Sequence, residues 1–413
     1  MPDSRHVLNV CKDRYLFAVG FAATILADKV SFLPPNHLPE IVRHLKQLAP
    51  DTVCLTDHEA GIDLPLIPWP RAPAPLPDHW EVPLVPRGRR VACVFTSGST
   101  GTPQPHYKTW GRLVDCVRIE ADRIGLSDGI KRVLVATVPP QHMYGLESSV
   151  LVALQSGQAL CAERPFFPAD IATLLGDLPL PRVLVSTPIH LAALLATRLQ
   201  MPEIERVLSA TAALAAPLAR DIELRLGARV LEIYGSTETG QIASRCTTQN
   251  VEWQLWAGVQ LSKQGGRTWA QGGHVEVPTP LGDLVEMTTR DRFRLGGRID
   301  DLVNIAGKRN SLPFLNHQLL ALAGVTDGVF FVHDTLHEAR TSATRLGALV
   351  VAPSLTASDI LRHLRERIDP VFLPRPLLLV DRVPRNATGK VPRAALQSLL
   401  VRDGPPSLHI ARR

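Results

Sequence analysis

Short apolar runs of strand length alternate along this chain with segments of helical pattern. Clear runs are Arg90–Phe95, Arg182–Ser186 and Arg229–Ile233, and a helical pattern at Leu214–Leu226 leads into the last of them. Continuous apolar runs are typical of strands that are buried on both faces of a parallel sheet, which helices cover. We therefore predict an α/β fold whose parallel or mixed sheets are flanked by helices.

Other segments of the same region fit this alternation. The strand candidates are Arg132–Thr137 and Arg206–Ser209, and the helix candidates are Leu16–Ala27, Glu147–Gln155 and His190–Arg198. A proline-rich stretch, residues 64–77, separates a small N-terminal αβ unit from the strand at Arg90–Phe95.

The chain of 413 residues is long enough for two or three domains. Strand and helix signals start again after about residue 298, with a strand candidate at Ala348–Ala352 and a helix candidate at Ala357–Ile368. We expect a large domain over residues 1–297 and a small α+β domain over residues 298–413.

Charge and cysteine usage limit the function classes. The net charge is +6, but only 20% of residues are charged and no Lys/Arg block has interleaved aromatic residues, so nucleic-acid binding is not expected. The arginines that become frequent after residue 360 indicate a solvated basic face or a docking surface for an acidic partner. Six cysteines at irregular spacing form no disulfide framework, which favours a reducing compartment.

The apolar stretch Leu16–Ala27 has two interpretations, a signal peptide and a buried helix. It follows the mixed-charge segment Cys-Lys-Asp-Arg, it lacks a clear cleavage site, and it is too short to span a bilayer. A buried helix is the better interpretation, so we expect a cytoplasmic protein with no membrane contact.

Residues 96–103, Thr-Ser-Gly-Ser-Thr-Gly-Thr-Pro, directly follow the first apolar run. Gly98 and Gly101 let the backbone turn its N–H groups inward. The hydroxyl donors among these residues are Thr96, Ser97, Ser99 and Thr100. Such a nest suits a pyrophosphate group, although an exposed turn has the same composition. It is not a Walker A loop, since no Gly-Lys-Ser/Thr follows.

Three later segments complete a pattern. They are Leu231–Gly240 (Leu-Glu-Ile-Tyr-Gly-Ser-Thr-Glu-Thr-Gly), Gly297–Arg309 (Gly-Arg-Ile-Asp-Asp-Leu-Val-Asn-Ile-Ala-Gly-Lys-Arg) and Pro384–Arg393 (Pro-Arg-Asn-Ala-Thr-Gly-Lys-Val-Pro-Arg). In this order, and with the loop at 96–101, they resemble the adenylate-forming superfamily of acyl-CoA synthetases, aryl-acid ligases and peptide-synthetase adenylation domains. The resemblance covers roughly residues 90–395.

The resemblance implies a fold and a reaction. The large domain would carry a small mobile α+β C-terminal domain, and a helix like Leu16–Ala27 would precede a strand at Val30–Leu33. With ATP and Mg²⁺ as cofactors, a carboxylate would join the α-phosphorus of ATP to give an acyl-adenylate and pyrophosphate. A thiol would then attack the mixed anhydride. The protein would supply positioning and charge stabilisation rather than a covalent intermediate.

The resemblance also assigns roles in the nucleotide site. The loop at 96–101 would hold the β- and γ-phosphates, Tyr234 would lie near the adenine, and Thr237 would contact the α-phosphate. Glu238 would ligate Mg²⁺, because a lone carboxylate on a turn can hold a hard cation whose other ligands are phosphate and water.

Roles in the ribose site and the small domain follow in the same way. Asp283 would accept from the ribose hydroxyls, with Asp291 as the competing candidate, and Arg298 would add a ribose or phosphate contact. Lys390 matches the catalytic lysine of the family, and Asp300 lies where the family has its interdomain hinge.

The sequence departs from the family at the phosphate loop and at its start. The lysine that usually follows the Gly-x-Pro of the loop is Gln104 here, and His106 or Lys108 could restore the positive charge. Fewer residues than usual also precede the loop.

The acyl pocket would be compact and partly polar, which suits an aromatic acid better than a long alkyl chain. Its candidate residues are His142, Ser209, Ala210, Thr211 and Gly235, and Thr187, Pro188 and His190 lie in another stretch that would face it. The details also look like ligases of aryl-polyene or xanthomonadin pigment pathways, which load a hydroxybenzoate-type acid onto an acyl carrier protein. Coenzyme A is the alternative acceptor, and a catalytically inactive nucleotide- or acyl-binding homologue is a further alternative.

Overall fold

The computed structural model describes residues 4–70, 81–97, 103–298, 302–305, 308–334, 344–385, 391 and 396. The chain divides into two compact units. The first comprises Met1–Pro280 and Met287–Arg294, and the second comprises Leu281–Glu286 and Leu295–Arg413. The expected boundary, at residues 297 and 298, lies close to the third point at which the chain passes from one unit to the other, between Arg294 and Leu295.

The first sheet of the first unit has six strands in the order β4-β3-β1-β2-β5-β6. Its strands are β1 (His6–Asn9), β2 (Val30–Leu33), β3 (Val53–Thr56), β4 (Leu66–Pro68), β5 (Arg90–Ser97) and β6 (Pro103–Thr109). All neighbours are parallel except β5 and β6, which are antiparallel. The helices α1 (Arg14–Leu26) and α2 (Pro39–Leu48) connect its first strands. The strands expected at Val30–Leu33 and Arg90–Phe95 are therefore present.

Strand β4 lies inside the proline-rich stretch that we interpreted as a separator. Its pairing with β3 runs from Cys54 with Leu66 to Thr56 with Pro68. Because β4 is the edge strand of the sheet, Pro68 interrupts no ladder on its outer side. Because prolines are unfavourable in central strands, the proline content did not indicate a strand here, although an edge strand accepts them.

The second sheet has the order β17-β18-β13-β12-β11-β10-β9-β7-β8. Its strands are β7 (Val133–Ala136), β8 (Ala159–Leu160), β9 (Arg182–Ser186), β10 (Arg206–Ser209), β11 (Arg229–Ser236), β12 (Gly240–Arg245), β13 (Trp253–Leu255), β17 (Asp283–Met287) and β18 (Arg292–Arg298). The strands β8, β7, β9, β10 and β11 are parallel, and β12, β13 and β18 continue antiparallel. The division between the two units runs through the β17–β18 hairpin.

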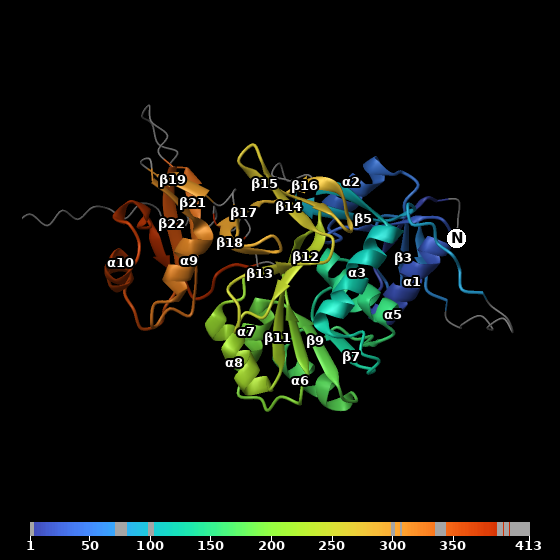
Figure 1. The fold of residues 1–413 in the computed structure, drawn as a ribbon, viewed down its shortest axis with the longest axis horizontal. Coiled ribbons are helices and arrows are strands. Elements are labelled where there is room, and N and C mark those ends of the chain that lie inside the picture. Colours follow the sequence, from blue (N-terminus) through green and yellow to red (C-terminus); the bar gives the residue numbers. More distant parts are fainter. Residues whose placement is uncertain are drawn as a thin grey trace, which may run out of the picture. The chain divides into compact units, whose positions relative to one another are not determined.

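Helices cover both sheets in the manner that the alternating pattern predicts. They are α3 (Trp110–Ile124), α4 (Met143–Gly145), the π-helical turn η1 (Leu146–Leu151), α5 (Val152–Ser156), α6 (Pro168–Asp177), α7 (Pro188–Ala196) and α8 (Ala216–Leu226). Leu175, Leu191 and Ile222 from α6, α7 and α8 pack against Leu184 and Val207 of the strands in one buried core, and Figure 1 shows these helices beside β9 and β11. A third, antiparallel sheet comprises β14 (Gln260–Gln264), β15 (Arg267–Gly272) and β16 (Val275–Pro280).

The second unit has its own core. Its elements are the hairpin of β19 (Leu302–Ile305) and β20 (Lys308–Ser311), α9 (Leu312–Leu320), the sheet of β21 (Asp327–Asp334), β22 (Thr344–Val351) and β23 (Leu377–Leu379), α10 (Ala357–Arg365), and the 3₁₀ turn η2 (Pro370–Phe372). Leu319, Ala348 and Ile360 are fully buried between these elements. The strand and helix that were expected at Ala348–Ala352 and Ala357–Ile368 are present as β22 and α10.

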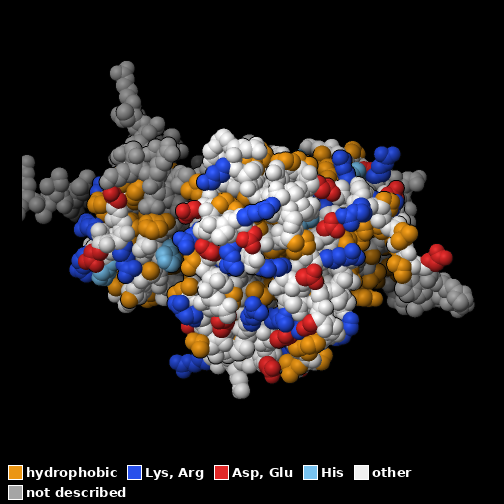
Figure 2. Space-filling model, viewed as in Figure 1, with side chains coloured by type: hydrophobic (Ala, Val, Ile, Leu, Met, Phe, Trp, Pro, Cys, Tyr) orange, Lys and Arg blue, Asp and Glu red, His pale blue; other side chains and the backbone are white. Residues whose placement is uncertain are grey.

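The α/β fold class is confirmed. All six cysteines are free, buried thiols. No helix within the described ranges is long and apolar enough to cross a membrane. In Figure 2, Lys and Arg side chains on the first unit are interspersed with Asp and Glu rather than gathered into one patch on this face.

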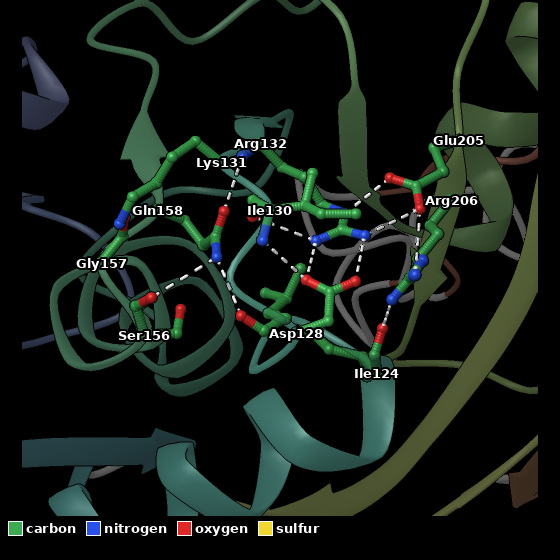
Figure 3. A network of polar contacts seen from close by, with 11 residues as sticks. Ile124, Asp128, Ile130, Lys131, Arg132, Ser156, Gly157, Gln158, Glu205 and Arg206 are labelled. Atoms are coloured by element: carbon green, nitrogen blue, oxygen red, sulfur yellow. Dashed lines mark hydrogen bonds and ion pairs between the residues drawn. The ribbon is translucent and has the colours of Figure 1, made fainter.

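A buried arginine network joins the amino ends of β7 and β10 (Figure 3). Arg132, whose side chain is 1% exposed, donates to both Asp128 oxygens at 2.7 Å and to Glu205 Oε2 at 2.6 Å. The guanidinium of Arg206 donates to Glu205 Oε1 at 3.0 Å. These bonds to Arg132 lower the pKa of the carboxyl groups of Asp128 and Glu205 below their usual values. The charge of this buried cation is therefore matched by carboxylates.

We expect Arg132→Met to cost about 1–3 kcal/mol of the free energy of unfolding, because it removes charge-assisted hydrogen bonds from a buried position. Urea unfolding measures the change. The control is Arg118→Met, since Arg118 is exposed and donates to Gln155 at 3.3 Å, and its effect should stay within about 0.5 kcal/mol. Equal stability of both variants would contradict a structural role for the network.

Candidate active site

Polar residues follow the parallel strands of the second sheet at their carboxyl ends. Thr137 follows β7, Thr187 follows β9, and the hairpin turn Ser236–Gly240 follows β11. Since the carboxyl ends of parallel strands meet at one edge of a sheet, these residues gather there, at the edge where α/β proteins bind ligands.

The turn Ser236–Gly240 has a defined shape. The Ser236 N–H donates to Thr239 Oγ1 at 3.1 Å, the Thr239 N–H donates to Ser236 Oγ at 3.2 Å, and the Thr239 hydroxyl donates to the Gly240 carbonyl at 2.7 Å. A Cβ on Gly235 would lie 2.2 Å from the Gly240 carbonyl oxygen, and Gly240 has a φ of +72°. Two glycines and two hydroxyls therefore hold the loop so that Thr237 and Glu238 lie at its tip, half-buried.

The end of β5 and the return strand β6 meet this turn. His106 Nε2 lies 2.9 Å from Thr96 Oγ1 and 3.7 Å from Glu238 Oε1. Burial lowers the pKa of His106, against the opposing effect of Glu238. The structure thus brings together Thr96 and Glu238, which the sequence assigned to phosphate and magnesium from segments more than a hundred residues apart.

The two candidates for the missing loop lysine differ in what they contact. Gln104 is exposed. His106 lies beside the side chains of Thr96 and Glu238, whereas the ammonium of Lys108 donates to the backbone carbonyls of Thr237 and, at 3.2 Å, of Glu238. Lys108 is 1% exposed, and burial, with the nearby charge of Arg112, lowers its pKa to about 8.

Arg112 is a residue that the sequence analysis missed. Its guanidinium donates to the carbonyl of Glu238 from the first turn of α3. Cys116 and Glu120 follow on the same face of α3 at intervals of four, and both are buried. A polar stripe on the inner face of an otherwise amphipathic helix was the signal that could have revealed it.

Tyr234 ends the regular part of β11, where the ladder to β12 changes register. Its ring lies 5.5 Å from the ring of Trp253 and 5.7 Å from that of Phe293. Gly235 follows it and is exposed. The position at the carboxyl end of a central strand suits the expected contact with adenine, which stays a prediction.

The residues expected in the acyl pocket lie on several loops at this edge. His142 is half-buried, and its Nε2 lies 3.1 Å from the carbonyl oxygen of Pro35. Ser209 is fully buried, and its hydroxyl has no hydrogen-bond partner within the described residues, while Ala210 is also buried. Thr211 is exposed with a φ of +77°.

Hydroxyl groups cluster around His190 at the carboxyl ends of β7 and β9. Thr137 Oγ1 is 2.9 Å from Ser186 Oγ and 3.0 Å from His190 Nδ1, and the Thr187 hydroxyl is 3.3 Å from the same nitrogen. The ring of Phe166 meets the His190 ring edge-on at 5.4 Å. The cluster therefore joins hydroxyl groups and an aromatic edge at the carboxyl ends of β7 and β9. Thr187 and His190 were singled out from the sequence, whereas Thr137 and Ser186 were not.

Several predicted residues belong to parts of the chain that the structure does not describe. Gly98, Ser99, Thr100, Gly101, Asp300 and Lys390 lie outside the described residues, as do the side chains of Ser97 and Arg298. Asp283 begins β17 in the second unit and is half-buried. Asp291, its competitor for ribose, is exposed in the first unit and accepts from the Thr289 hydroxyl at 2.9 Å. The ribose assignment therefore stays a prediction.

Glu238 suits a shared rather than a self-contained metal site. Within the described ranges, no three His, Cys, Asp or Glu side chains are grouped so that they could hold a metal ion alone. The Glu238 side chain is 40% exposed, and a single carboxylate is what Mg²⁺ takes from a protein when phosphates and water supply its other ligands.

Comparison with known proteins gives a consistent result. The model of the AMP-binding enzyme family matches residues 2–280. The 4-coumarate–CoA ligase of Halorhodospira halophila is 28% identical over 302 residues, which span 72% of this chain and 73% of that protein. The 4-chlorobenzoate–CoA ligase of an Arthrobacter species is 26% identical over 361 residues, or 76% and 67% of the two chains.

Solved structures share the fold. ATP-bound MatB from Rhodopseudomonas palustris matches with a TM-score of 0.79 at 19% identity, covering 97% of this chain and 89% of that one. The o-succinylbenzoate coenzyme A synthetase of Bacillus subtilis, in complex with ATP and a magnesium ion, matches with a TM-score of 0.78 at 18% identity, covering 96% and 89%.

We expect Gly235→Ala to destabilise the first unit by about 1–3 kcal/mol, because the new methyl would overlap a backbone carbonyl that cannot move without opening the hairpin. Urea unfolding gives the magnitude. Gly88→Ala is the matched control, since nothing lies within 4 Å of its Cβ position. A Gly235→Ala protein as stable as this control would show that the turn is not tightly held.

Proposed function

The chain belongs to the AMP-binding enzyme family, and on that basis we propose that it activates a carboxylic acid with ATP and Mg²⁺ and passes the acyl group to a thiol. The carboxylate oxygen bonds to the α-phosphorus while the bond to the β-phosphate breaks, which releases pyrophosphate. The thiol sulfur then bonds to the acyl carbon, and AMP leaves. Both steps need charge stabilisation and alignment rather than a nucleophile on the protein.

One observation supports this proposal most strongly. Thr96, at the start of the hydroxyl- and glycine-rich loop, and Glu238, at the tip of the β11–β12 turn, both lie beside the His106 ring. The first residue of a loop suited to β- and γ-phosphates and a carboxylate suited to Mg²⁺ thus share one neighbouring side chain. Bound Mg²⁺ would neutralise charge on the phosphates, and the Thr237 hydroxyl would contact the α-phosphate.

The remaining roles are proposals of the same kind. Lys390 would bring its ammonium to the reacting oxygens, Asp283 and Arg298 would hold the ribose, and Asp300 would act as a hinge. In this proposal, the small domain, residues 298–413, reorients against the large domain, residues 1–297, between the two steps. Such a motion needs only a few residues that absorb a dihedral change.

For the acid, we propose an aromatic one of the hydroxybenzoate type. The cluster of Thr137, Ser186 and His190 beside Phe166 offers an aromatic edge and hydroxyl groups that suit a ring with a polar substituent. The names of the relatives, 4-coumarate–CoA ligase and 4-chlorobenzoate–CoA ligase, are those of enzymes for aromatic acids.

For the thiol, we propose the phosphopantetheine of an acyl carrier protein, as in the pigment-pathway ligases that the sequence resembles. Free coenzyme A is the second candidate, and the names of the relatives favour it. Two basic residues near the chain end are already paired, Arg362 with Asp359 and Arg385 with Asp327, so a basic docking surface would depend on others. Thioester yield with free coenzyme A and with holo carrier protein separates the two candidates.

We expect ATP–pyrophosphate exchange that depends on added acid, measured across benzoates, cinnamates and fatty acids, with a benzoate giving the fastest rate. Lys390→Ala should lower that rate by about 10²–10³, the effect of removing a group that stabilises developing charge. Lys46→Ala is the control, since Lys46 forms only a surface ion pair with Asp63. If the unaltered protein shows no exchange with any acid, it is not an acid-activating enzyme.

A further inference from the structure

Two cationic side chains converge on the backbone of the Thr237–Glu238 turn. Lys108 comes from β6 and donates to both carbonyls, and Arg112 comes from α3 and donates to the carbonyl of Glu238. All of these residues lie in the first unit. The side chains of Thr237 and Glu238 are not used in these contacts, so the cations hold the turn from its inner side.

The environment of Lys108, on the six-stranded sheet, differs from that of Arg132, a deeply buried cation beside β7 of the nine-stranded sheet. Arg132 is bonded to two carboxylates (Figure 3). Lys108 is as deeply buried, yet within the described residues no carboxylate lies in ion-pair contact with its ammonium. Glu147 and Glu238 act on Lys108 only through space, and burying a cation without a direct carboxylate partner costs free energy. Stability alone does not explain a lysine here.

The contacts also orient the peptide groups. The peptide between Thr237 and Glu238 is trans, since the cis bonds of the described chain lie elsewhere. In a trans peptide the C=O and N–H point in opposite directions, so a carbonyl that faces Lys108 turns the Glu238 N–H away from it. An N–H group on that side, backed by two positive charges, is a donor for an anion.

We propose that Lys108 and Arg112 are positioning residues for the nucleotide: they hold the Thr237–Glu238 turn so that its side chains and N–H group meet the phosphates, and they supply from behind the turn the positive charge that Gln104 does not supply. This inference rests on the proposed function. It assigns the two cations a task different from that of His106, which contacts side chains on the ligand-facing side.

The test compares Lys108→Met with Arg132→Met, since each removes one buried cation from the first unit. Calorimetric titration with Mg·ATP, in the absence of any acid, measures nucleotide binding directly. We expect Lys108→Met to weaken binding at least tenfold and to raise the KM for ATP without changing the KM for the acid. Its urea midpoint should fall less than that of Arg132→Met, which should bind Mg·ATP as the unaltered protein does.

Arg112→Met decides the matter if Lys108→Met does not fold, because Arg112 is only half-buried and its loss should weaken Mg·ATP binding in the same direction. Normal Mg·ATP binding by the folded variants would overturn this inference, and so would equal loss of binding in Arg132→Met. If the unaltered protein neither binds Mg·ATP nor catalyses exchange, the proposed function itself fails, and the two failures are distinguished.

Discussion

The contact between β6 and the Ser236–Gly240 turn is the interaction on which the candidate site depends. It joins the six-stranded sheet, which carries the phosphate loop, to the nine-stranded sheet, which carries Glu238. Each sheet has an apolar core of its own, and α3 packs against β6 of one sheet and β12 of the other. The polar contacts of His106, Lys108 and Arg112 connect the two segments directly.

The residues behind the turn show that this arrangement has a cost. Burial raises the pKa of Glu120 to about 8 and that of Glu147 to about 7, and it lowers that of Lys108 to about 8. Ionisable groups of both signs are thus buried where an apolar helix face would be more stable. The Arg132 network lies at the opposite ends of the strands and pairs its charges. The candidate site therefore buries charges at a cost that the Arg132 network avoids, as expected where function competes with stability.

Strands that are continuous apolar runs could be predicted from the sequence to the residue, as at Arg182–Ser186 and Arg206–Ser209. Strand β4 was missed because prolines mask an edge strand, and the helix expected at Glu147–Gln155 begins as a π-helical turn, which no side-chain period reveals. The motifs predicted that Thr96 and Glu238 belong to one site, and both lie beside His106. The choice between His106 and Lys108 could not be made from the sequence, because residues two apart on a strand point to the same face. Their contacts differ because the Thr237–Glu238 turn, which is distant in the sequence, offers its backbone carbonyls to Lys108 and not to His106.

In the proposed reaction, AMP becomes a leaving group through a bond between the acid and the α-phosphorus. An acid whose carboxylate carries oxygen-18 tests this bond, with mass spectrometry of the nucleotide after thioester formation. We expect one labelled oxygen to pass from the acid to AMP. Unlabelled AMP, or ADP with the label in inorganic phosphate, would contradict it.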